Sequence, residues 1–173
     1  MRLQILFGVN VILAFVAWGI FAARYAWPWL RTRPLMEALK PVLLLHSFRF
    51  IGLAFLVPGV VGPGLPETFA RPAAYGDLAT ALLALLALAT LSSRIGVMVV
   101  WLFNVVGTAD LLLAYFNGNR VGLGFAPGLQ GAMYFIPTLL APLLVVTHVL
   151  VFRLLFGREG RRVNWRLRAS DGV

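Results

Sequence analysis

The chain has 173 residues, of which 61% are hydrophobic and 12% are charged, and its net charge is +9. Soluble domains carry about 25% charged residues, so this composition indicates a membrane protein. The sequence has no cysteine, which excludes disulfides, thiolate metal sites and cysteine nucleophiles. Because the positive charges flank apolar stretches, we expect them to meet anionic lipid and not nucleic acid.

Five stretches are long and apolar enough for transmembrane helices. The first begins at Leu3, and its length favours a retained helix over a cleaved signal peptide, whose apolar core has about 7–15 residues. From Leu78 to Phe116 the chain is apolar for nearly twice the ~30 Å hydrocarbon core, so it must reverse at Ser92-Ser93-Arg94. The sequence therefore predicts an all-α bundle over residues 1–156, a tail over 157–173, and spans at 3–23, 41–57, 77–91, 95–116 and 132–152.

Turn and cap residues refine these boundaries. Pro41 suits the first turn of the second span, and Asp77 suits the N-cap of the third. The turn-rich segment 59–76 is expected either to cap the bundle or to act as a lid over a cavity. Pro137 and Pro142 lie inside the fifth span, where each is expected to kink the helix and free a backbone carbonyl.

The basic residues divide unequally between the two sides of a five-span chain. Three fall on the side of the N-terminus, namely Arg2, Arg71 and Arg120. Eleven fall on the other side: Arg24, Arg31, Arg33, Lys40, Arg94, Arg153, Arg158, Arg161, Arg162, Arg166 and Arg168. The positive-inside rule therefore predicts an external N-terminus, a cytoplasmic C-terminus and a basic tail against anionic lipid.

The candidate site residues are six polar residues inside the predicted spans: His46, Arg49, Asn104, Asp110, Thr138 and His148. Placing an arginine at membrane depth costs roughly 2.5–3.5 kcal/mol on insertion scales, so such residues usually face the bundle interior and have a function. At 1.5 Å per residue, His46, Arg49, Asn104 and His148 are predicted to share one layer near the cytoplasmic side. Asp110 and Thr138 are expected nearer the outer side.

These residues favour a buried site for a small ligand, an ion or a proton, in a protein that has a transport or accessory role and is not an enzyme. Arg49 is expected to hold an anionic group or to pair with Asp110, Asn104 or a freed carbonyl, and His46 and His148 are candidate titratable partners. No Gly-x-Ser-x-Gly or His-Glu-x-x-His motif is present, which disfavours an intramembrane hydrolase.

Two alternatives remain open. In the first, His46 and His148 are the axial ligands of a b-type haem, which requires a flat slot between backbones roughly 10–15 Å apart. In the second, the protein is an accessory subunit of a homo-oligomer or larger membrane complex, and its polar residues only fix helix packing.

Four stretches carry a family resemblance: His46 to Gly52 (His-Ser-Phe-Arg-Phe-Ile-Gly), Leu65 to Asp77, Trp101 to Asp110 and Ile136 to His148. Together they resemble a group of small, uncharacterised bacterial integral membrane proteins with five spans. The resemblance implies a multi-pass protein of the bacterial inner membrane, and it implies no activity.

Overall fold

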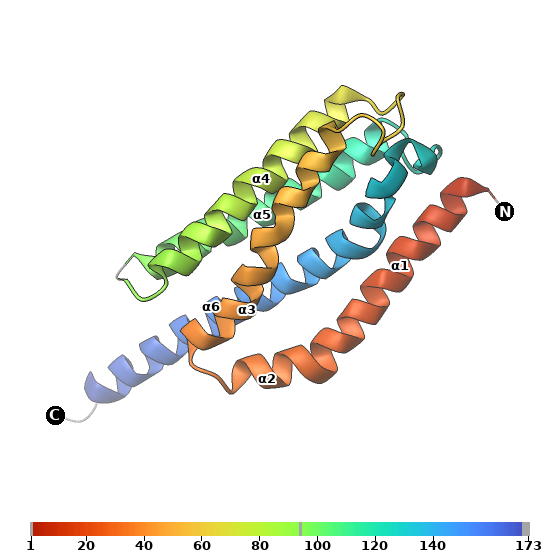
Figure 1. Ribbon diagram of the computed structural model, residues 1–173. Helices are drawn as coiled ribbons and strands as arrows, with labels where there is room; N and C mark the ends of the chain where they lie inside the picture. Colours follow the sequence, from red (N-terminus) through yellow and green to blue (C-terminus); the bar gives the residue numbers. More distant parts are fainter. Residues whose placement is uncertain (1, 94, 171–173) are drawn as a thin grey trace.

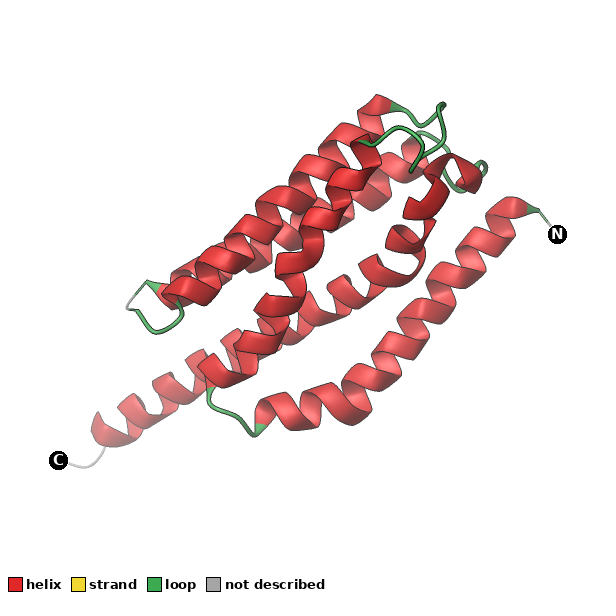
Figure 2. Ribbon diagram, in the orientation of Figure 1, coloured by secondary structure: helices red, strands yellow, loops and turns green. Residues whose placement is uncertain are grey.

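A computed structural model describes the backbone of residues 2–93 and 95–170 and the side chains as far as Gly157. Every regular element in the described part of the chain is a helix (Figure 2). Within that part, five helices are long and apolar enough to cross a membrane, as the sequence predicted. They cover Leu3–Arg31, Leu35–Leu56, Glu67–Thr90, Gly96–Arg120 and Ile136–Gly157.

The five apolar helices run alternately in opposite directions, and the start of α1 and the far end of α6 lie at opposite ends of the molecule (Figure 1). Helices α4 and α5 lie side by side, whereas α1 runs along the outside of the bundle and packs mainly on α6. The elements are α1 (Leu3–Phe21), η1 (Ala22–Ala26), α2 (Trp27–Arg31), α3 (Leu35–Ser47), η2 (Phe48–Leu56), α4 (Glu67–Thr90), α5 (Gly96–Arg120), η3 (Pro127–Tyr134), η4 (Ile136–Leu140) and α6 (Ala141–Ser170).

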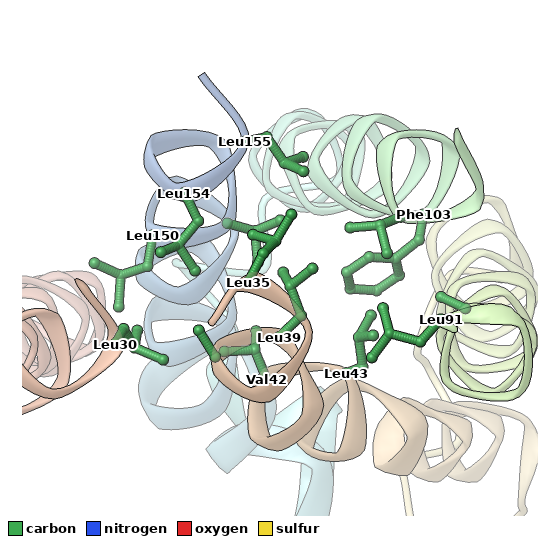
Figure 3. Packing of buried hydrophobic residues seen from close by; sticks show 14 of the residues in the cluster. Leu30, Leu35, Leu39, Val42, Leu43, Leu91, Phe103, Leu150, Leu154 and Leu155 are labelled. Carbon is green, nitrogen blue, oxygen red and sulfur yellow. The ribbon is translucent and has the colours of Figure 1, made fainter. Parts of the chain in front are cut away.

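The largest apolar cluster joins α3, α4, α5 and α6 near the end of the bundle where α4 finishes. Leu39 and Leu43 of α3 are fully buried. Leu39 lies between Phe103 of α5 and the leucines of α6, and Leu43 lies beside Phe103 and Leu91 (Figure 3). Close packing of this kind holds helices together in lipid, where apolar side chains gain little from leaving the solvent. This apolar cluster fills the bundle at that end and adjoins the polar residues described next.

Two of the predicted helix starts are wrong. Helix α3 begins at Leu35, so Pro41 lies inside the helix and not in its first turn. Helix α4 begins at Glu67, so Asp77 lies well inside the helix, buried, and is not an exposed N-cap. A glutamate in the first turn complements the positive end of the helix dipole, which is a start signal ahead of Asp77. The predicted reversal is confirmed, because α4 ends at Thr90 and α5 begins at Gly96, although Arg94 itself lies outside the described residues.

Element η2 continues α3 as a 3₁₀ helix of nine residues. A 3₁₀ helix has three residues per turn, so side chains three positions apart lie on one line along its surface. The buried residues of η2 follow this period, since they are Arg49, Gly52 and Phe55. That line of residues faces α4, and the local winding therefore directs Arg49 into the bundle interior.

Candidate functional site

Arg49 is the centre of a buried ion-pair cluster. Only 1% of the residue is exposed, and its Nε donates to Asp77 Oδ1 of α4 over 2.7 Å. Its Nη2 pairs with Asp110 Oδ2 of α5, and its Nη1 lies 3.4 Å from the Gly107 carbonyl of the same helix. The guanidinium thus bonds to two neighbouring helices from a third, in the manner suited to its fixed fork of donors.

The charges of this cluster do not cancel. The side chains of Asp77 and Asp110 are only 12% and 13% exposed, so both carboxylates are largely removed from solvent. One guanidinium neutralises one of them, which leaves a single negative charge when both are ionised. An uncompensated charge inside a membrane helix bundle is costly, so one further positive charge would stabilise this cluster.

Three glycines let the polar side chains approach the neighbouring backbones. At each of them, an added Cβ would overlap a side chain of the cluster on another helix. The overlapping pairs are Gly52 with Asp77, Gly76 with Asp110, and Gly107 with His148. The close approach of η2, α4, α5 and α6 around Arg49 therefore depends on the absence of these three side chains.

His148 of α6 extends the cluster and is held as one neutral tautomer. Asn104 donates from Nδ2 to the His148 carbonyl over 3.3 Å, so its Oδ1 remains as an acceptor for His148 Nδ1, 2.7 Å away. A proton on Nδ1 leaves a lone pair on Nε2, and that atom lies 3.4 Å from Arg49 Nη1, which is always a donor. His148 thus accepts from the guanidinium and is not itself charged in this arrangement.

His46 of α3 lies against His148, with ring centroids 4.3 Å apart. The hydroxyl of Thr147 donates to a backbone carbonyl of its own helix, so its oxygen accepts from His46 Nε2 over 2.9 Å. His46 Nδ1 is buried, and no described residue forms a hydrogen bond with it. The site thus has two adjoining parts: the contacting histidines His46 and His148, and the ion-pair cluster around Arg49.

The two histidines do not fit a haem as they lie. A macrocycle between two axial ligands separates the imidazoles by a flat slot, whereas these rings contact each other and both contact Phe103. Three of their four nitrogens already lie within hydrogen-bonding distance of protein groups. Among the residues that the structure describes, no group of three or more His, Asp or Glu is placed to hold a metal ion.

The structure brings together five of the six residues that the sequence singled out, and leaves Thr138 apart. Thr138 is buried but donates only to the Tyr134 carbonyl, one turn earlier in its own segment. Sequence reasoning missed Asp77 as a site residue, because it placed Asp77 at the N-cap of the third span. The position of Glu67, one residue after Pro66, was the signal that could have moved Asp77 inside a longer helix.

Comparisons with known proteins identify a family and no relative of known activity. No curated protein and no solved structure matches the chain. One family model, described as a domain of unknown function (DUF8737), matches residues 6–156. That match covers nearly all of the five apolar helices and every residue of the buried cluster. The chain therefore belongs to the DUF8737 family.

Proposed function

We propose that this protein is an integral membrane protein whose buried cluster of Arg49, Asp77 and Asp110 takes up a proton. The observation that carries the proposal is the imbalance of two carboxylates around one guanidinium. A proton on one carboxylate removes the remaining negative charge without any new protein contact, as in other pairs of carboxylates that share a site. The neutral histidine beside Arg49 supports placing this proton on a carboxylate and not on an imidazole.

Access to the cluster favours Asp110 as the group that takes the proton. Both carboxylates line a cavity that also borders η3 and the start of the fifth apolar helix. Both carboxylates pack against a glycine, Asp77 on Gly52 and Asp110 on Gly76, but Asp77 is buried as a whole residue whereas Asp110 is partly exposed. Asp110 has a slightly more exposed side chain and lies on the cavity wall beside Leu111 and Ala114. The proposal therefore assigns proton exchange to Asp110 and charge balance to Arg49.

Infrared difference spectroscopy tests this assignment. The purified protein in lipid is taken through a pH titration, and the carbonyl band of a protonated carboxylic acid is followed in H₂O and D₂O. We expect one such band to appear on acidification, to be absent in Asp110→Asn, and to persist in Thr138→Val as the matched control. If no carboxylic acid band assignable to Asp77 or Asp110 forms at any pH at which the protein remains folded, the cluster only locks the helices together.

We further propose the location and orientation of the chain. The excess of basic residues beside Arg31 and Arg33, and in the tail, supports a cytoplasmic C-terminus and an external N-terminus. The resemblance to bacterial proteins supports the inner membrane as the location. The tail arginines beyond Arg153 lie outside the residues with described side chains, and their composition supports contact with anionic lipid.

A further inference from the structure

A cavity of about 60 Å³ opens beside the carboxylates of the cluster. Its wall is mostly apolar and includes Phe55 of η2, Phe69 of α4 and Tyr115 of α5. Its polar groups are few, and they include the two carboxylates and Gln130 of η3. An apolar pocket with a small number of converging polar groups is the usual form of a small-molecule site.

Gln130 is the second observation that indicates a ligand. The residue has no exposed surface, and neither its amide oxygen nor its amide nitrogen has a hydrogen-bond partner in the described part of the chain. Leaving both atoms unpaired reduces stability, so a buried amide of this kind is normally satisfied by something. Gln130 borders the cavity, so a group bound there is a natural candidate to pair with this unpartnered donor and acceptor.

The backbone around Gln130 is fixed by the opposite loop. Gly62 donates to the Leu129 carbonyl, and Ala132 donates to the Val60 carbonyl, each over 2.9 Å. Between them Gly131 has a φ of +52°, and an added Cβ there would overlap the backbone of residue 60. The backbone on both sides of Gln130 is therefore held against the opposite loop.

We propose that this cavity binds a small amino alcohol, with the ammonium group at Asp110 and the hydroxyl group at Gln130. The proposal rests on the charge imbalance that underlies the proposed function, because the ammonium supplies the missing positive charge. A hydroxyl both donates and accepts, so it matches an amide whose nitrogen and oxygen are both unpaired. The carbon atoms between these groups meet the aromatic wall, where a cation is also favourably placed.

The cavity size limits the ligand to a few heavy atoms. An apolar cavity of roughly 150 Å³ accommodates benzene, and this one is less than half as large. Ethanolamine is small and carries one ammonium and one hydroxyl, and it serves as the probe. Propylamine lacks the hydroxyl and ethylene glycol lacks the charge, so the two analogues separate the two contacts at constant size.

Isothermal titration calorimetry on the unmutated protein in detergent gives the first test. We expect ethanolamine to bind at least tenfold more tightly than propylamine and than ethylene glycol. Equal affinity for ethylene glycol, or no saturable binding of ethanolamine, overturns the inference and leaves water as the occupant of the cavity.

Two variants then assign the contacts. We expect Asp110→Asn to abolish the preference for ethanolamine over ethylene glycol. We expect Gln130→Leu to abolish the preference for ethanolamine over propylamine and to retain the preference for ethanolamine over ethylene glycol. Thr138→Val, buried and outside the cavity wall, should leave all three affinities unchanged. An unchanged preference in either cavity variant overturns the corresponding contact.

The outcome is separable from that of the proposed function. The infrared titration contains no amine, so it measures proton uptake at Asp110 independently. A carboxylic acid band without ethanolamine binding rejects only the amino alcohol. Ethanolamine binding without any carboxylic acid band supports the ligand site and rejects only the proton.

Discussion

Replacing Arg49 by methionine should be among the most damaging single substitutions in this protein. The change removes the only cation that the structure pairs with Asp77 and Asp110 among the described residues, and both carboxylate side chains are less than 15% exposed. Removing one partner of a buried ion pair costs about 3–5 kcal/mol, because the other charge stays buried without compensation. We expect a loss of stability in this range for Arg49→Met.

The assay is unfolding of the purified protein in mixed micelles by increasing denaturing detergent, and a matched pair of variants isolates the effect of burial. Arg71 also pairs with a carboxylate, Glu67, but both side chains are more than 60% exposed, so Arg71→Met should change stability by about 0–1 kcal/mol. Combining Arg49→Met with Asp77→Asn and Asp110→Asn removes all three charges and should recover most of the loss. If Arg49→Met alone is as stable as Arg71→Met, burial of the cluster is not what makes its charges important.

Three further outcomes follow from the structure. In the same detergent titration, Gly107→Ala should lower the stability by about 1–3 kcal/mol, because the new Cβ would lie 2.6 Å from the His148 imidazole. Gly8→Ala, where an added Cβ has nothing within 4 Å, should be neutral or slightly stabilising. Tyr115→Phe removes a 3.0 Å hydrogen bond to the Pro137 carbonyl and should lower the stability, measured in the same way, by about 1 kcal/mol. No loss of stability would mean that the carbonyl finds another donor. Single cysteines at Arg71 and Arg33 should behave oppositely toward an impermeant thiol reagent in intact cells, with only the former labelled, and the reverse pattern would invert the proposed orientation.

The sequence was sufficient to predict the number of apolar helices and the reversal between α4 and α5, because both depend on length and composition. An apolar run of 39 residues is too long to cross a bilayer only once, whichever apolar residues it contains. The sequence also indicated that Arg49 needs a polar partner, since the free energy of an isolated charge in lipid is prohibitive. It named Asp110 as one of three candidate partners, beside Asn104 and a freed carbonyl, and the structure pairs Arg49 with Asp110.

What could not be predicted depends on helix phase and on local winding. Asp77 looked like a cap because the apolar run begins just after it, but the helix starts earlier, in less apolar sequence. The burial of Gln130 could not be predicted, since a glutamine in a turn-rich segment is normally exposed to solvent. Its burial results from contacts between two loops that are far apart in sequence, and no local pattern encodes such contacts.

The 3₁₀ winding of η2 also sets how this part of the chain can change in length. One inserted residue turns every later side chain by about 120°, which would carry Phe55 a third of the way around the helix and away from Phe69. Three inserted residues restore the phase completely, whereas an α-helix returns only approximately after four. Insertions or deletions of one or two residues between Arg49 and Phe55 should therefore disturb the packing more than those of three, which keep the phase and shift Phe55 only along the helix axis.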